Sequence, residues 1–251
     1  MQSRRTASPK KPLKRSPVNF SGGSGGVKPG DICPDLKVGP GYPWGVEKLG
    51  PLFIILFAAA LVLVAVLSVR PLPEIIVVVD AGHGGHDPGA VVSGVQEKDL
   101  NLTLALLVAR KAQGIRGLKV VLTRSTDIYV DLVERVRMAE ALGAALYLSI
   151  HANYHQDQRV CGIETWVDTN AGPESQRLAE TIQRAVVSAT GGADRGVRRQ
   201  TLYLRHTFLP TALVEVGYLS CPSERKKLLD PAYQERIAEG ILQGIREFLG
   251  I

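Results

Sequence analysis

Cysteine is scarce in this sequence of 251 residues. There are three cysteines, Cys33, Cys161 and Cys221, and no two of them have Cys-x-x-Cys spacing. Such a set does not make a disulfide framework. Cys161 and Cys221 are expected in the same domain and would pair only in an oxidising compartment. We expect them to stay unpaired.

Beyond its first 49 residues the sequence lacks an excess of charge of either sign. The whole chain holds 30 basic and 24 acidic residues, a net charge of +6. Residues 1–49 hold nine of the basic and three of the acidic residues, which leaves 21 of each kind for the rest. A pI of 9.3 would by itself suggest a nucleic-acid partner. Because the large domain carries no net basic charge, we expect no nucleic acid as a partner.

Residues 1–50 contain no long apolar stretch. They are rich in Gly, Pro, Ser, Lys and Arg, and residues 21–26 read SGGSGG, the composition of a flexible linker. Such a segment buries too little apolar surface to offset the entropy that is lost on ordering. We therefore predict a disordered basic tail over residues 1–50.

Residues 52–69 form an apolar run that no charge interrupts. As a helix the run would be about 27 Å long, close to the hydrocarbon thickness of a bilayer. A buried core helix and a cleaved signal peptide are the alternatives. The run is apolar on every face, and it is longer than the roughly 7–15 apolar residues of a signal peptide. We predict an uncleaved transmembrane helix over residues 51–70.

The basic tail also predicts the orientation of this segment. Lys and Arg residues beside a span stay on the cytoplasmic side of the membrane. We therefore expect a single-pass protein of the bacterial cytoplasmic membrane, with its N-terminus inside and residues 71–251 outside. The nearest partner of the tail is then the anionic headgroups of that membrane.

Residues 71–251 alternate between patterns typical of strands and of helices. This order predicts one α/β domain, with a mixed sheet and helices on both of its faces. The predicted strands are residues 75–80, 119–123, 145–150, 162–167, 201–204 and 212–216, and the predicted helices are residues 99–113, 131–142, 174–189, 223–229 and 231–249.

Three polar side chains stand at strand ends or in the loops that follow, where open α/β sheets bind ligands. His83 lies in the glycine-rich turn DAGHGGHDPGA, Glu97 comes just before a predicted helix, and His151 follows the apolar strand 145–150. Two histidines and one carboxylate are the ligands of many hydrolytic zinc sites. The three residues are therefore candidate metal ligands.

Glu215 is a candidate general base. It interrupts the apolar strand ALVEV, where an unpaired carboxylate is costly to bury. A metal-bound water beside Glu215 is one explanation, and an ion pair with Arg205 or Arg124 is another. Each candidate ligand also has a structural interpretation, and ligands at such long spacings form no local motif.

The sequence resembles the zinc-dependent N-acetylmuramoyl-L-alanine amidases of the branch called amidase type 3. The matching segments run in the order and spacing of that family and lie within residues 75–250. They are VVVDAGHGGHDPGA (77–90), QEKDLNL (96–102), VLTRSTDIYVDLVERVRMAEALGAALYLSIHAN (121–153), GIETWV (162–167) and LPTALVEVGYLS (209–220).

This resemblance implies a mixed six-stranded sheet with flanking helices, a Zn²⁺ ion held by His83, Glu97 and His151, and Glu215 as the catalytic glutamate. The implied reaction is hydrolysis of the amide that joins N-acetylmuramic acid to L-alanine in peptidoglycan. Zinc would activate a water molecule, and Glu215 would take its proton and pass it to the leaving amine. We expect the protein to be a monomer.

Other matching residues are expected to be structural. Arg124, Asp127 and Arg135 should tie the loop after the second predicted strand to the helix that follows, and Asn153 should fix the loop behind His151. Some relatives carry an inserted helix that covers the zinc site. Residues 160–173 leave little room for such a helix, so we expect an open cleft.

Two other functions compete with the amidase. A non-catalytic relative would bind peptidoglycan or a partner protein, but all four catalytic positions of the family are present here, which disfavours it. A zinc hydrolase of another amide would have the same ligands, so only substrate assays separate it from the amidase.

Overall fold

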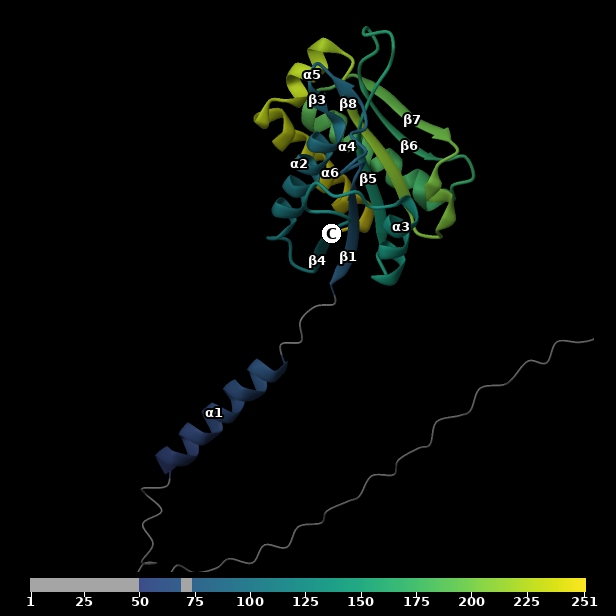
Figure 1. Ribbon diagram of the computed structural model, residues 1–251. Coiled ribbons are helices and arrows are strands. Elements are labelled where there is room, and N and C mark those ends of the chain that lie inside the picture. Colours follow the sequence, from purple (N-terminus) through teal and green to yellow (C-terminus); the bar gives the residue numbers. More distant parts are fainter. Residues whose placement is uncertain (1–49, 69–73) are drawn as a thin grey trace, which may run out of the picture. The chain divides into compact units, whose positions relative to one another are not determined.

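A computed structural model of the protein describes residues 50–68 and 74–251. The chain divides into two units, residues 1–68 and residues 69–251, and each is described by itself (Figure 1). Apart from Gly50, the predicted basic tail lies outside the described residues.

Helix α1, Gly50–Ser68, is the described part of the first unit. Its sequence contains no charged residue, and apolar side chains such as Phe53 and Phe57 are exposed. Among the described residues, no helix combines the length and the hydropathy that crossing a membrane requires. The structure thus gives no support to the transmembrane segment predicted over 51–70, which stays a prediction from the sequence.

The second unit is built on one mixed sheet. Its strands are β1 (Ile75–Ala81), β4 (Leu118–Leu122), β5 (Leu146–Asn153), β6 (Ile163–Asp168), β7 (Asp194–Gln200) and β8 (Thr211–Tyr218). They lie in the order β4-β1-β5-β8-β6-β7 (Figure 1). All neighbours are parallel except β6 and β8, which are antiparallel. The predicted α/β class with a mixed six-stranded sheet is therefore confirmed.

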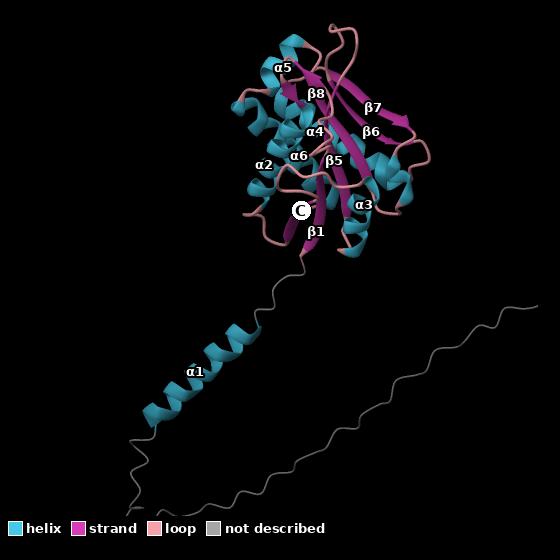
Figure 2. Cartoon of the chain, viewed as in Figure 1, coloured by secondary structure: helices cyan, strands magenta, loops and turns pink. Residues whose placement is uncertain are grey.

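Helices cover both faces of this sheet (Figure 2). They are α2 (Glu97–Ala112), α3 (Leu132–Ala141), α4 (Pro173–Thr190), α5 (Pro222–Leu228) and α6 (Pro231–Leu249), with a short 3₁₀ helix, η2 (Tyr203–His206). α2 and α4 pack on one face with α6 against them, and α3 and η2 pack on the other.

Strand alternation divides the apolar residues between two cores. Val77 and Val79 of β1 pack with Leu104 of α2 in the larger core. Val78, between them, points to the other face and packs with Tyr147 of β5 and Ala139 of α3. The two-residue period of the strand thus determines which side chains of β1 meet which layer of helices.

Two segments differ from the sequence prediction. The strand predicted over residues 201–204 is wrong, because these residues lead into η2. The strand that completes the sheet is instead β7, DRGVRRQ, which the apolar pattern does not predict. β7 is an edge strand, and its side chains are half-buried or exposed, so it needs no apolar alternation.

A second addition is a hairpin of β2 (Val91–Val92) and β3 (Val95–Gln96). The hairpin runs directly into α2, which begins at Glu97 and not at residue 99 as predicted. Glu97 therefore directly follows β3 and is the first residue of α2.

Cys161 and Cys221 form a disulfide, with 5.6 Å between their Cα atoms. The expectation that they stay unpaired is wrong, because the sheet places the start of β6 beside the end of β8. Glu224 of α5 reinforces this junction: its carboxylate accepts hydrogen bonds from the backbone N–H of Gly162 and of Tyr218. The bridge joins the loop after β5 to the N-terminus of α5.

Candidate metal centre and catalytic site

His83 stands in the turn that follows β1, and its backbone is held in an unusual conformation. Its φ of 62° lies in the left-handed region, which is uncommon for a residue other than glycine. Two buried arginines hold this turn. Arg135 donates to the carbonyl of His83, and Arg124 donates to the carbonyls of Ala81 and Gly82. The strain is maintained by these bonds, which aim the imidazole at Glu97.

Glu97 is buried, with 5% of its surface exposed. One carboxylate oxygen accepts a hydrogen bond from the N–H of Ala90, and the other accepts from the N–H of Ala152 and from Asn101 Nδ2. Since α2 begins at Glu97, the positive end of the helix dipole also favours the ionised carboxylate. Glu97 is therefore fixed in both position and charge.

His151 lies near the end of β5, directly against the turn that carries His83. A Cβ atom on Gly82 would lie 2.3 Å from Cε1 of His151, a distance that no side chain tolerates. Glycine at position 82 is thus required if the His151 ring is to occupy this place. The two imidazole rings meet edge to face, with centroids 4.9 Å apart.

The structure brings these three residues together although they are far apart in the sequence. His83 Nε2 lies 3.2 Å from Glu97 Oε2, and His151 Nδ1 lies 2.9 Å from Glu97 Oε1. One ligand atom from each residue falls within 4.8 Å of the others, a spacing that suits a shared metal ion. Burial raises the pKa of Glu97, but hydrogen bonds and charge from His151 and His83 outweigh it and hold that pKa well below its usual range.

The donor set fits a divalent metal such as zinc, since two imidazoles and one carboxylate leave a fourth position open. A second layer of bonds orients the ligands. His83 Nδ1 is bonded to Asp87 at 2.8 Å, which leaves Nε2 free to face Glu97. A second cluster, Cys161, Cys221 and Glu224, has similar spacing, but its sulfurs are consumed by the disulfide.

Glu215 lies on β8 beside the three candidate ligands. It is in register with His151 of β5 on one side and with Glu164 of β6 on the other, so the three side chains share one face of the sheet. Its Oε2 is buried and has no hydrogen-bond partner among the described residues. Burial, with the negative charges of Glu97 and Glu164, raises the pKa of Glu215 well above its usual value.

The arginines and Asp127 bond to more of the structure than the sequence predicts. Arg124 donates to backbone carbonyls of the His83 turn and to that of Lys98, so it joins this turn to α2. Arg135 pairs with Asp80 at the end of β1, at 2.6 Å. Asp127 accepts from the N–H of Gly85 and from Lys98. All three residues therefore organise the loop of His83. The expected tie between the loop after the second predicted strand and the helix that follows is also present, because Arg135 of α3 donates to the carbonyl of Val130 at 2.8 Å.

Asn153 does fix the region behind His151. Its Nδ2 donates to Glu164, and its Oδ1 accepts from the N–H of Tyr154. Arg124 and Arg205 were the two ion-pair partners considered for Glu215. The guanidinium of Arg124 donates to backbone carbonyl groups instead, and the side chain of Arg205 lies outside the described part of the chain.

A cavity of about 310 Å³ opens beside the two histidines, on the face of the sheet that α3 covers. Tyr129, Leu132 and Leu213 give it apolar walls. Residues 160–172, all of them described, hold β6 and no inserted helix. Both histidines thus line a cavity on the α3 side of the sheet.

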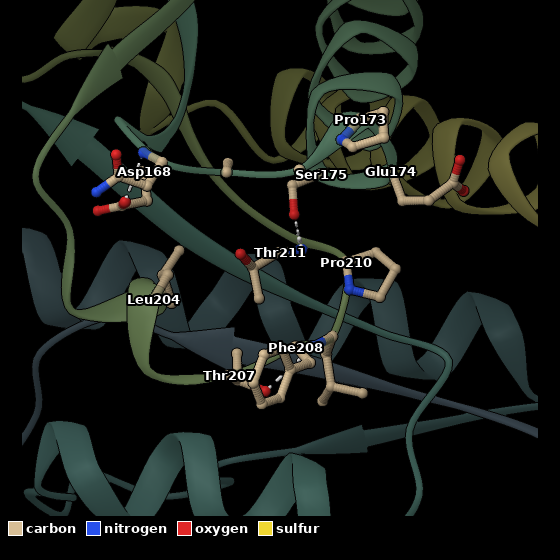
Figure 3. Close-up of a pocket in the computed structure, with 13 residues that line it drawn as sticks. Asp168, Pro173, Glu174, Ser175, Leu204, Thr207, Phe208, Pro210 and Thr211 are labelled. Carbon is tan, nitrogen blue, oxygen red and sulfur yellow. Dashed lines mark hydrogen bonds between the residues drawn. The ribbon is translucent and has the colours of Figure 1, made fainter.

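A second hollow, of about 370 Å³, lies near the start of β8 (Figure 3). Thr211 donates its N–H to Ser175 Oγ there, and Asp168 lies at the end of β6. Thr211 is four residues before Glu215 on the same strand, toward the opposite end of β8, and the hollow is lined by neither histidine nor cysteine. Its lining thus offers no imidazole or thiolate donor for a metal.

Sequence reasoning missed Asp87 and Asn101, which orient His83 and Glu97. Each stands four residues after the ligand that it supports. For Asn101 this spacing is a usable signal, because residues four apart lie on one face of a helix. Asp87 lies in an irregular turn, where no periodic pattern reveals its partner.

Comparisons with known proteins agree with this geometry. A family model described as N-acetylmuramoyl-L-alanine amidase, Amidase_3, matches residues 77–247. The N-acetylmuramoyl-L-alanine amidase LytC of Bacillus subtilis (strain 168) is 38% identical over 168 residues, which cover 66% of this chain and 34% of LytC. The chain therefore spans about a third of the length of that relative.

Solved structures cover the second unit more completely. The catalytic domain of CwlV, an N-acetylmuramoyl-L-alanine amidase from Bacillus (Paenibacillus) polymyxa var. colistinus, is 40% identical with a TM-score of 0.68, over 71% of this chain and 99% of that domain. An N-acetylmuramoyl-L-alanine amidase from Clostridium difficile 630 is 37% identical with a TM-score of 0.68, over 70% of this chain and 97% of its own. The family match extends over most of the chain and includes all three candidate ligands and Glu215. The chain belongs to the Amidase_3 family of N-acetylmuramoyl-L-alanine amidases.

Proposed function

We propose that this protein hydrolyses the amide bond between N-acetylmuramic acid and L-alanine in peptidoglycan, with a zinc ion held by His83, Glu97 and His151. The observation that carries the proposal is the place of Glu215. Its carboxylate lies on the same face of the sheet as His151, on the neighbouring strand, and one of its oxygens has no partner among the described residues. Family membership supports the choice of substrate.

The donor groups of these three residues suit a zinc ion. His83 and His151 offer imidazole nitrogens as donors, and Glu97 offers a carboxylate that its surroundings keep ionised. A zinc ion held by these residues would act as a Lewis acid, polarising a carbonyl group and making a water molecule more acidic.

Glu215 performs the proton transfers. Its free oxygen accepts a proton from the attacking water and delivers it to the nitrogen of L-alanine as the amide bond breaks. Arg124 and Arg135 hold the His83 turn in place throughout, through bonds to backbone carbonyls. The apolar walls of the adjoining cavity exclude bulk water from part of the substrate.

The non-catalytic alternative remains disfavoured, because no position of this constellation is missing. A hydrolase of another amide is separated from the amidase by its products, since the metal ligands are common to both.

The proposed reaction is tested with the full chain in detergent and purified peptidoglycan. We expect free stem peptides with an L-alanine N-terminus, identified by mass spectrometry. A chelator should abolish their release, and Glu215→Gln should lower it by about 10²- to 10⁴-fold, the usual contribution of a general base. Glu180→Gln, an exposed change on α4, is the matched control. Intact linkages after incubation with zinc would exclude the amidase, and full activity of Glu215→Gln would exclude the base.

We also propose that residues 71–251 act outside the cytoplasmic membrane, held by the segment 51–70. Two observations support this location: nine basic residues precede the apolar run, and the catalytic unit carries a disulfide, which persists in oxidising compartments. Protease added to intact protoplasts should degrade the catalytic unit. Protection of that unit until the cells are lysed would contradict the proposal.

A further inference from the structure

The row of side chains that begins at His151 and Glu215 continues across the sheet to Glu164. Glu164 is 1% exposed, yet it accepts five side-chain contacts. Its Oε1 accepts hydrogen bonds from Asn153, Trp166 and Tyr218. Its Oε2 forms ion pairs with two arginines of β7, Arg195 at 2.9 Å and Arg198 at 3.0 Å.

This arrangement leaves a positive charge at the surface. One carboxylate neutralises only one of two guanidinium groups, and both arginine side chains reach solvent, with 29% of Arg195 and 42% of Arg198 exposed. A guanidinium carries five N–H donors, of which Glu164 occupies few. The two arginines, called here the β7 arginine pair, can therefore accept a second anion.

The β7 arginine pair is held in place before any ligand arrives. The side chain of Arg195 lies against Gly162, where a Cβ atom would come within 2.7 Å of it. Its guanidinium lies 5.3 Å from the ring of Tyr218, and that of Arg198 lies 5.8 Å from the ring of Trp166. Donors fixed in this way lose little entropy on binding, which favours a planar carboxylate.

The distance between the candidate metal centre and the β7 arginine pair determines which part of the substrate can contact the pair. β5, β8, β6 and β7 are successive strands, so β5 and β7 are about 14 Å apart. The arginines reach back over β6, to about 10 Å from His151 by the same spacing. An extended peptide advances about 3.4 Å per residue. The gap of about 10 Å is about three such steps, so an acidic group on one of the first three residues after the scissile amide comes within reach of the arginines.

We propose that Arg195 and Arg198 bind the α-carboxylate of the residue that follows L-alanine in the stem peptide. This inference rests on the proposed amidase function. It fixes the direction of the substrate: the peptide that leaves lies over β6 and β7, and the sugar chain lies toward the apolar cavity on the α3 side.

The test compares two synthetic substrates, N-acetylmuramoyl tripeptides whose second residue is either D-glutamate, with a free α-carboxylate, or its α-amide. Both carry a C-terminal amide, so they differ in one carboxylate. For the zinc-loaded full chain we expect a KM at least about tenfold lower for the carboxylate, as a charge-assisted bidentate contact provides. Arg198→Gln should bring the two KM values together, and Arg198→Lys should retain part of the difference.

Arg199→Gln is the matched control. Arg199 lies on the same strand but bonds to Gln176 of α4 and to the carbonyl of Thr169, and it does not contact Glu164. The twofold alternation of a strand turns it to the other face. We expect Arg199→Gln to keep the tenfold difference in KM, and thermal unfolding monitored by circular dichroism checks that each variant is folded.

Two results would overturn the proposal: a wild-type protein that does not distinguish the substrates, or an Arg198→Gln variant that still does. If neither substrate is cleaved, the amidase function is at fault. The binding of both compounds to the full-length Glu215→Gln variant, measured by calorimetry, then tests the β7 arginine pair separately. If the pair binds the carboxylate, the compound with the free carboxylate binds more tightly, whether or not the amide is cut.

Discussion

At the scale of single residues, the candidate centre depends on a glycine that has no side chain as much as on the side chains that form it. Gly82 lies against the ring of His151, and an added methyl group would stand 2.3 Å from Cε1. The ring must then move away from Glu97, to which its Nδ1 is now 2.9 Å. The residue at position 82 therefore controls the position of His151, a candidate metal ligand, without being a candidate ligand itself.

We expect Gly82→Ala to weaken zinc binding by about 10- to 100-fold, the range found when the support of a ligand is removed. Competition with a chromophoric chelator measures the affinity. Gly114→Ala is the control, because no atom lies within 4 Å of its added Cβ. Equal zinc affinity in the two variants would show that His151 tolerates displacement.

The same scale shows where sequence patterns stop. His83, Glu97 and His151 are separated by 14 and 54 residues, and no periodicity joins them. The family resemblance proposed the set, and the fold brings its members within 4.8 Å. The β7 arginine pair had no such signal, because Arg195 and Arg198 lie in a strand that the pattern did not predict.

At the scale of elements, α6 packs closely on α4 through its glycines. A Cβ atom on Gly240 would lie 2.8 Å from Cα of Val186, so the backbone of one helix leaves no room for a side chain on the other. Alanine has the higher helix propensity by about 1 kcal/mol, which on its own would favour substitution. Overpacking of a tight contact outweighs that gain.

Gly240→Ala should therefore lower the free energy of unfolding by about 1–3 kcal/mol, measured in urea. Gln243→Ala, an exposed change on the same helix that removes one surface hydrogen bond to Glu247, serves as the reference for a substitution outside the tight contact. A stabilised Gly240→Ala variant would mean that α6 can shift away from α4 at no cost.

The disulfide acts on several elements at once. It links residues 60 positions apart, and a cross-link of this kind contributes about 2–4 kcal/mol by restricting the unfolded chain. We expect the double variant Cys161→Ser, Cys221→Ser to lose that amount in urea unfolding. A thiol reductant should destabilise the wild type and leave the double variant unchanged, and equal stability of the two oxidised proteins would argue against a formed bridge.

Buried strands could be predicted from the sequence, and the edge strand β7 could not. β1, β5 and β8 are buried and rich in apolar residues, and their predicted cores at 75–80, 145–150 and 212–216 are confirmed. β7 lies at the edge, where only one neighbour and no apolar face are needed, so its charged sequence resembles a loop. β7 is a strand because it pairs with β6, and the local pattern of apolar residues carries no information about this long-range contact.

At the scale of the whole molecule, stability depends on pH through buried carboxylates. Burial raises the pKa of Asp80, but the charge of Arg135 and hydrogen bonds from Ser149, Thr123 and Arg135 outweigh it, so the pKa lies below its ordinary value of 3.8. A lowered pKa stabilises the fold above the ordinary value. That contribution is lost as the pH falls below it toward the folded-state pKa.

We therefore expect the unfolding free energy of the chelated wild type to fall below about pH 4, and Asp80→Asn to show a shallower fall, by up to about 1.4 kcal/mol per pH unit. At neutral pH the variant should be less stable by about 3–5 kcal/mol, because Arg135 loses its buried partner. Urea unfolding between pH 2 and 7 measures both effects. Parallel curves for the two proteins would assign the acid sensitivity to other groups.

The bridge between Cys161 and Cys221 closes a covalent ring in the chain. β6, α4, β7 and β8 lie inside this ring, and with them Glu164, the β7 arginine pair and Glu215. A protease that cuts any one peptide bond between the two cysteines produces no free fragment, since the sulfur bridge still holds both ends. The part of the candidate site that carries Glu215, the proposed general base, thus stays attached after a single nick, whereas the described residues hold no disulfide that would bridge a cut between His83 and Glu97.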